Sequence, residues 1–230
     1  KHSKVISGYA FKSESFTDIG IPIVKISNIG LGEVKFEKDN TQFVDNVFLD
    51  EIDKKFIVSF GDILISLTGS HITQPNSVVG RVALYKEPIC SLLNQRAGKV
   101  IEIDNKVFHP RFLFYVLNSQ SVRTTIALMA HGAASQANVS PKDVERIKLL
   151  VPNVESQKKI AAILSAYDDL IENNKKRIQI LENMAEELYK EWFVRFRFPN
   201  WQNTEFEKGV PKGWGTCNLE SLGSVRTGKT

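Results

Sequence analysis

The final eight residues of the chain carry its most explicit chemical motif. "GSVRTGKT" (223–230) matches the pattern G-x-x-x-x-G-K-[ST] of a phosphate-binding loop. Such a loop needs a buried strand before it and a helix after it, because the amides at the helix N-terminus hold the phosphate. The preceding "NLESLG" is a poor buried strand, and the sequence stops at the threonine. We therefore expect no nucleotide site here.

Other candidates for catalysis are weaker. Asp18, Glu33 and Lys35 can be fitted to an Asp…Glu-x-Lys nuclease pattern, but a turn with paired surface charges explains "GEVK" equally simply. The four histidines (His2, His71, His109 and His131) lack the spacing of metal ligands. No G-x-S-x-G, glycine-rich adenosylmethionine loop or Asn/Asp-Pro-Pro-aromatic motif occurs. The sequence predicts a chain without catalysis, cofactor or metal, with a nuclease or nucleotide-hydrolysing enzyme as the alternative.

A set of polar and basic residues remains, and its chemistry suits DNA. Asn and Gln can pair with adenine, Arg with guanine, and Lys, Ser and Thr with phosphate. Taken singly, each residue is more typical of a surface or turn. The densest cluster is the loop "GSHITQPN" (69–76). The predicted DNA-binding residues are Tyr9, Lys12, Lys25, Ser27, Asn28, Thr68, Ser70, His71, Thr73, Gln74, Asn76, Gln95, Arg96, Gln136 and Asn138.

Composition places these residues in an ordinary globular chain. The 230 residues are 42% hydrophobic and 24% charged, with a net charge of +4. Most of the positive excess falls in residues 1–150, which suits a modest affinity for polyanions. Cys90 and Cys217 form no CxxC pair, and no apolar run approaches the roughly 18 residues that cross a membrane. We expect a cytoplasmic protein with no membrane contact. It opens on Lys1, which suggests a fragment or trimmed chain.

The elements that must position these residues change along the chain. Residues 1–108 are mainly short strands and turns, with strands expected within 21–29, 62–70, 78–86 and 98–104. Helical spacing begins after His109, with Pro110 in the first turn. Residues 129–140 are expected to form a loop, after which Ser140 caps a helix that has Pro141 at its first position. "KLLVP" (148–152) is expected to be a strand, and residues from about 153 to 192 a long helix.

The long helix carries a seam with the spacing of a coiled coil. The seam residues alternate in steps of four and three, and we predict that they dimerise. A polar residue in the middle of such a seam costs stability but fixes register, because a shifted partner would leave its amide unpaired. The predicted dimerisation residues are Ile160, Leu164, Tyr167, Ile171, Asn174, Ile178, Leu181, Ala185, Leu188 and Trp192.

The order of several segments is similar to one known family. The segments are "SGYAFKSESF…GIPIVKISNIGLGEV", "GDILISLTGS…GRVALY", "LLNQRAGKV", "PRFLFYVLNS", "HGAASQANVSPKDVERIKLLVPNVESQKKIAAILSAYDDLIENNKKRIQILENMAEELYKEWF" and "VPKGWGTCNLESLGSVRTGKT". Together they closely resemble the DNA specificity (S, HsdS) subunit of Type I restriction–modification systems, over nearly the full chain.

The resemblance implies an α+β fold and a non-catalytic, DNA-binding function. Residues 1–152 would form a strand-rich target recognition domain with a few helices, and 153–198 a long coiled-coil-forming spacer helix. Residues 199–230 would open a second recognition domain, or supply an edge that completes the first. Family partners are double-stranded DNA, methyltransferase (M) subunits that methylate adenine, and restriction–translocase (R) subunits.

The sequence departs from the full-length family pattern in having one recognition domain. It is either a piece of a two-domain subunit or a truncated, half-length form. In both cases the seam needs a second helix. We predict a homodimer with antiparallel spacer helices that reads a palindromic bipartite site. A coiled-coil scaffold without a DNA role is a further alternative.

Overall fold

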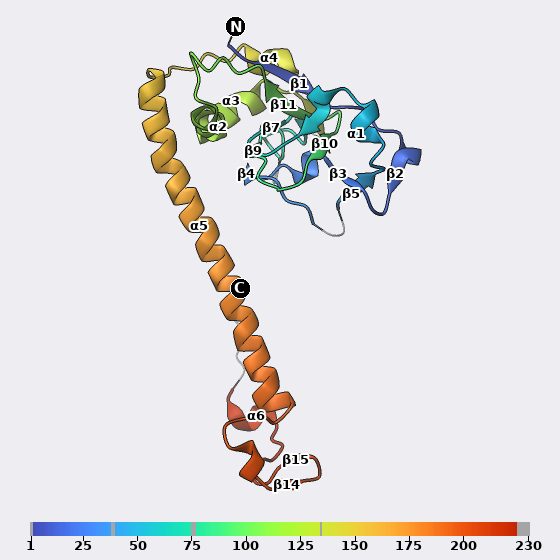
Figure 1. Ribbon diagram of the computed structural model, residues 1–230, viewed down its shortest axis with the longest axis vertical. Coiled ribbons are helices and arrows are strands. Elements are labelled where there is room, and N and C mark those ends of the chain that lie inside the picture. Colours follow the sequence, from blue (N-terminus) through green and yellow to red (C-terminus); the bar gives the residue numbers. More distant parts are fainter. Residues whose placement is uncertain (1, 38–39, 75–76, 134, 225–230) are drawn as a thin grey trace. The chain divides into compact units, whose positions relative to one another are not determined.

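The computed structural model describes residues 2–37, 40–74, 77–133 and 135–224 (Figure 1). The chain forms two compact units, Lys1–Ser165 and Ala166–Thr230. The first unit holds the sheets and short helices, and the second holds most of the long helix and a small C-terminal hairpin. The fold is α+β and strand-rich with one long helix, as the sequence predicts.

Two five-stranded sheets form the body of the first unit. The first has the order β1-β11-β7-β9-β4 and is antiparallel except between β4 and β9. Its strands are β1 (Lys4–Ser7), β11 (Ala97–Ile101), β7 (Ile63–Ser66), β9 (Val82–Leu84) and β4 (Gly32–Glu33). The second has the order β2-β5-β3-β10-β6, with β3 and β10 parallel. Its strands are β2 (Phe16–Thr17), β5 (Gln42–Val44), β3 (Ile21–Val24), β10 (Ser91–Leu93) and β6 (Ile57–Val58).

Residues 129–140 fold into a hairpin, so the expected loop is wrong. Strands β12 (His131–Ala133) and β13 (Gln136–Asn138) pair with each other, and β13 pairs with β8 (Thr68–Gly69). The polar, small-residue sequence has weak strand propensity of its own. Its strand geometry comes from a tertiary contact, since Ala137 is fully buried opposite Gly69.

Four short helices belong to the first unit. They are α1 (Phe48–Glu51), α2 (Pro110–Asn118), α3 (Gln120–Leu128) and α4 (Pro141–Glu145). The expected helical stretch after His109 is interrupted at Ser119, whose backbone is extended. Phe114 of α2 and Ile126 of α3 join the largest core cluster with Ile65 of β7. Helices α2 and α3 thus bury their apolar faces against the first sheet.

Helix α4 begins as predicted. The Ser140 hydroxyl accepts a hydrogen bond from the Asp143 backbone nitrogen, and the Asp143 carboxylate accepts one from the Ser140 backbone nitrogen. Pro141 fills the first helical position, where its missing N–H costs nothing. This capping box satisfies two of the amides that a helix start leaves without partners.

The segment 148–152 is not a strand, so that expectation is wrong. Its backbone pairs with no strand in the described parts of the chain, and the Leu150 side chain is fully exposed. Pro152 cannot donate a ladder hydrogen bond, which disfavours pairing there. The segment instead leads directly into helix α5 (Val154–Tyr189).

Helix α5 confirms the long helix expected from about 153 to 192. It is 36 residues long, about 54 Å at 1.5 Å per residue, and continues into a π-helical turn at Lys190–Val194. In the second unit the hairpin of β14 (Phe206–Glu207) and β15 (Val210–Pro211) follows, then the short α6 (Leu219–Leu222).

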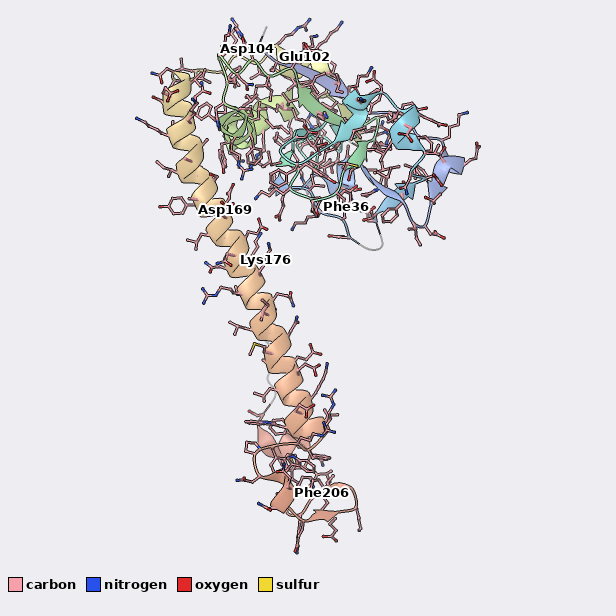
Figure 2. All side chains as sticks on the ribbon, in the orientation of Figure 1. Phe36, Glu102, Asp104, Asp169, Lys176 and Phe206 are labelled. Atoms are coloured by element: carbon pink, nitrogen blue, oxygen red, sulfur yellow. The ribbon has the colours of Figure 1, made fainter. Side chains whose placement is uncertain are left out.

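An aromatic cluster organises the C-terminal end of the second unit. Trp214 lies centrally, stacked on Phe198 at 5.8 Å and edge-on to Phe196 at 5.5 Å between ring centroids. Phe206, labelled in Figure 2, meets Phe196 from β14 at 6.2 Å. These contacts hold the segment after α5 together through a partly exposed aromatic cluster.

Candidate nucleic-acid interface

Five backbone connections meet at one end of the first sheet. The strand registers place the end of β1, the start of β11, the end of β7, the start of β9 and the start of β4 side by side. Within two residues of those strand ends lie Tyr9, Arg96, Thr68, Arg81 and Leu31. Three of these five were predicted DNA contacts, and the sheet brings them together although they are up to 87 positions apart in the sequence.

The second sheet brings Lys25 to the same place. Strand β10 runs parallel to β3, and the Asn94 nitrogen donates to the Val24 carbonyl over 3.0 Å. The Tyr9 nitrogen donates to the Leu93 carbonyl over 2.8 Å. Lys25 and Tyr9 therefore both adjoin the turn that carries Gln95 and Arg96, whose side chains are exposed.

The β12–β13 hairpin extends this surface with two amide side chains. Alternation along β13 buries Ala137 and exposes Gln136 and Asn138. The Thr68 hydroxyl donates to Asn138 Oδ1 over 2.8 Å, which fixes the orientation of that amide. A Cβ at Gly69 would lie 2.6 Å from Val78 Cγ2, so only glycine allows β8 to pair here. Close packing thus positions the two amides.

The loop after β8 is held by its own polar groups. The His71 ring nitrogen Nδ1 lies 3.0 Å from the Thr73 hydroxyl, and the Ser77 hydroxyl donates to the Ser70 carbonyl over 2.5 Å. Thr73 and Gln74 are exposed. The predicted contact Asn76 lies outside the described residues. The loop offers hydroxyl, imidazole and amide groups beside the hairpin.

Two predicted DNA contacts are buried, and the structure gives them supporting roles instead. Asn28 is completely buried, where its Oδ1 accepts from the Lys25 nitrogen and its Nδ2 donates to the Lys35 carbonyl. Thr68 is 6% exposed and positions Asn138. Neither side chain can reach a base in this conformation, since each polar group already has a partner inside the protein. Ser27, beside Asn28, is exposed.

Tyr9 and Lys12 connect the two sheets. The Tyr9 ring is 41% exposed and packs edge-on against Phe11 at 5.0 Å and tilted against Phe56 at 6.0 Å. Lys12 is exposed and precedes the 3-10 turn Ser13–Ser15, which leads into the second sheet. An anchored aromatic ring beside lysines is suited to contact with a nucleic-acid backbone or base.

Sequence reasoning missed two arginines next to this surface. Arg81 lines two neighbouring cavities of about 290 and 370 Å³, and Arg123 of α3 lines the first. Arg81 Nε donates to the Ser77 carbonyl over 3.2 Å, and Arg123 Nε donates to the Asn118 carbonyl over 2.9 Å. Each arginine stood alone among apolar or hydroxyl residues in the sequence, so no local pattern marked it.

The apolar seam of α5 is exposed along its length. Ile160 and Leu164 are 38% exposed, and Ile178 and Leu181 are 55% and 60% exposed. Asn174 is also exposed. Such a stripe is larger than the scattered apolar side chains of an ordinary surface. The last seam residue, Trp192, lies in the π-helical turn and is partly buried.

Comparison with known proteins identifies the family. The sequence model of the Type I restriction modification DNA specificity domain matches residues 3–183. The chain belongs to this family. The family resemblance described from the sequence motifs is therefore confirmed.

Two relatives of this chain are specificity subunits of Type I restriction enzymes. The MjaIX specificity subunit of Methanocaldococcus jannaschii is 32% identical over 164 residues, which cover 70% of this chain and 37% of that protein. The MjaVIII specificity subunit of the same organism is 28% identical over 182 residues, covering 79% and 41%. The chain thus spans less than half the length of these relatives.

A solved structure shares the fold of this specificity domain. It is the S subunit of a Type I restriction–modification system from M. genitalium, with a TM-score of 0.59 and 20% identity. The match covers 84% of this chain and 43% of that one. At this identity the likeness concerns the fold.

Of the residues considered for a nuclease, Glu33 and Lys35 form a surface ion pair away from Asp18. Glu33 Oε1 pairs with Lys35 Nζ at 3.1 Å, and both side chains are largely exposed. Asp18 follows β2, which lies well apart from β4 in Figure 1. Within the described ranges no group of three or more His, Cys, Asp or Glu side chains could hold a metal ion. Residues 225–230 of the phosphate-loop match lie outside the described part.

In the parts of the chain that the structure describes, no helix combines the length and hydrophobicity that crossing a bilayer requires.

Proposed function

We propose that this chain is a non-catalytic specificity subunit that reads one half of a bipartite DNA target with the converging end of its first sheet. The observation that carries the proposal is the meeting of Tyr9, Lys25, Arg96 and Asn138 from four separate segments. Exposed amide and guanidinium groups supply base readout, and lysines supply phosphate contacts. The half-target is double-stranded DNA.

Within this surface the residues divide by chemistry. Gln95, Arg96, Gln136 and Asn138 are exposed on a turn or a strand, where their backbone positions suit base readout, and the bond from Thr68 orients Asn138. Lys12, Lys25, Arg81 and Arg123 are the cations that would hold phosphates. The loop around His71 would contact either the sugar-phosphate backbone of the DNA or the edges of its bases.

The seam supports a homodimer with antiparallel helices. Its ten positions are symmetric about Lys176, which Figure 2 labels near the middle of α5. In an antiparallel second copy, each seam residue lies opposite a residue that occupies the other core position of the heptad. The opposed pairs are Ile160 with Trp192, Leu164 with Leu188, Tyr167 with Ala185, Ile171 with Leu181, and Asn174 with Ile178.

The sizes of the opposed side chains favour this register. The large Tyr167 faces the small Ala185, so the layer keeps a normal volume. The two Asn174 side chains come from adjacent layers on either side of the dyad, where their amides can pair. A slip of one heptad separates those amides and leaves two seam positions per chain without a partner.

The face of α5 is wider than a two-helix seam requires. Ile163, Leu170 and Met184 occupy the heptad position beside the seam and are 60%, 54% and 62% exposed. An apolar face three positions wide suits a helix with more than one neighbour. We assign this extra strip to the methyltransferase subunits, which would supply the adenine methylation that this chain does not perform. Restriction–translocase subunits would join that complex.

Two measurements test the proposal. Light scattering of the purified chain should give twice its mass of 25.9 kDa. Selection from a randomised double-stranded DNA library should then return a palindromic motif with two half-sites and a fixed gap. A dimer that enriches no motif would favour a scaffold without a DNA role. Turnover of DNA or nucleotide by the chain alone would favour the enzyme alternative.

A further inference from the structure

An apolar groove of about 430 Å³ lies within the first unit, between helices α2 and α3 and the first turns of α5. Tyr115 and Val122 form one wall, and Leu149 lies on the segment that precedes α5. Ile160 and Leu164 of α5 form the other wall. The groove therefore contains the first two residues of the seam, and the dimerisation face runs into it without a break.

The two seam residues that line the groove are less exposed than the two seam residues that follow them. Ile160 and Leu164 are 38% exposed, whereas Tyr167 and Ile171, one heptad further on, are 63% and 54% exposed. The difference comes from α2 and α3, which cover one side of the seam at its beginning. A partner helix that follows the seam must enter this groove.

We infer that the groove receives Leu188 and Trp192 of a second copy of the chain. The inference rests on the proposed antiparallel dimer, in which Leu188 faces Leu164 and Trp192 faces Ile160. The groove thus lies where the symmetry of the seam places the opposite end of the partner helix.

The chemistry of the groove matches this occupant. Trp192 is the largest side chain of the seam, and a two-helix seam alone has little room for an indole. The groove supplies apolar walls for the ring, and its rim carries the hydroxyls of Ser119 and Ser121. A buried indole N–H needs an acceptor, which a serine hydroxyl provides.

The consequence is a recognition unit held by two helices. Helix α5 of the same chain holds the recognition unit on one side. The end of the partner's α5 packs against its helices α2 and α3. The relative orientation of the two DNA-reading surfaces then depends on the groove as well as on the length of α5.

Photo-crosslinking tests the inference directly. p-Benzoylphenylalanine is placed at Ser121, an exposed residue of α3 on the groove rim. The control position is Leu128, which is exposed on the same helix but does not line the groove. Differently tagged full-length chains are mixed, irradiated and digested with trypsin. Crosslinks from position 121 should join the other copy within residues 178–190 or 191–195, and position 128 should give none there.

A charge in the groove gives a second readout. Val116→Asp, at a groove residue of α2 outside the core cluster, should weaken the dimer about tenfold or more, as expected for a buried anchor site, while Thr125→Asp on the exposed face of α3 should leave it unchanged. A dimer whose crosslinks from position 121 fall elsewhere would overturn the groove assignment and leave the proposed dimer intact. A monomeric chain would overturn both.

Discussion

Gln157 Oε1 accepts a hydrogen bond from the backbone nitrogen of His109 over 2.9 Å. Its Nε2 donates to the carbonyls of Val107 and Pro152, over 2.9 and 2.8 Å. The Gln157 side chain is completely buried. One amide therefore attaches the first turn of α5 to the segment before α2, with every polar atom of the side chain in use.

Loss of this amide should destabilise the first unit. Gln157→Leu removes the side-chain partners of one N–H and two carbonyls, and we expect a loss of about 3 kcal/mol in the free energy of unfolding. Gln157→Glu should also destabilise, because a carboxylate oxygen would face two carbonyl oxygens. Lys158→Ala, at an exposed neighbour, should change little. Denaturant unfolding measures all three, and a neutral Gln157→Leu would contradict the assignment.

Arg96 should be required for DNA binding in a way that distant cations are not. Arg96→Ala should weaken binding to the selected motif about tenfold, and Lys106→Ala should not. Lys106 is the matched control, since it is exposed beyond the opposite end of β11. Fluorescence anisotropy across a salt series measures affinity and its salt slope. Equal effects of the two substitutions would mean that binding is general electrostatic attraction.

Asn174 should control the register of the dimer. Asn174→Leu is expected to strengthen dimerisation while admitting slipped registers, so that targets with altered gaps between half-sites are also bound. Asn173→Leu, outside the seam on the adjacent exposed position, is the control. Competition between DNA duplexes that differ only in gap length measures the effect. Unchanged gap selectivity in a stable Asn174→Leu dimer would remove the register role.

The start of α4 should respond to acid. The side-chain hydrogen bond from Ser140 holds the pKa of the Asp143 carboxyl below its usual range. A carboxyl with a lowered folded pKa stabilises the fold above its unfolded pKa, and this contribution disappears as the pH falls through the folded pKa. Ser140→Ala should return the Asp143 pKa toward its usual range. NMR titration of the Asp143 side chain measures this pKa. If the Asp143 pKa were the same in Ser140→Ala as in the original chain, the hydrogen bond from the Ser140 hydroxyl would be excluded as the cause.

Local patterns predicted the elements whose geometry is determined locally. The spacing of apolar residues predicted α5, and Ser140 with Pro141 predicted the start of α4, because helix periodicity and capping involve neighbours in the sequence. The hairpin at 131–138 was missed because its strand geometry comes from pairing with β8. The apparent strand at 148–152 failed for the converse reason, since its apolar residues have no strand to pair with among those described.

The sequence indicated which residue types could bind DNA, but it did not show which of those side chains are buried. Asn28 and Arg96 look equally suitable in the sequence, and only the fold shows that Asn28 closes a turn while Arg96 is exposed. Gln157 gave no signal, because a lone glutamine on a helix is usually solvated. Arg81 reaches the site through the pairing of β7 with β9, a contact that no local pattern records.

The position of Gln157 and of Ala161, which is 2% exposed, has a practical consequence for building chimaeras. The compact first unit ends at Ser165, twelve residues into α5. A graft that exchanges first units at residue 152 would separate Gln157 from its hydrogen-bond partners at Val107 and His109, and Ala161 from the surroundings that bury it. A junction after Ser165 keeps the Gln157 side chain and its three backbone partners in the same unit, so we expect a chimaera joined there to be more stable than one joined at residue 152.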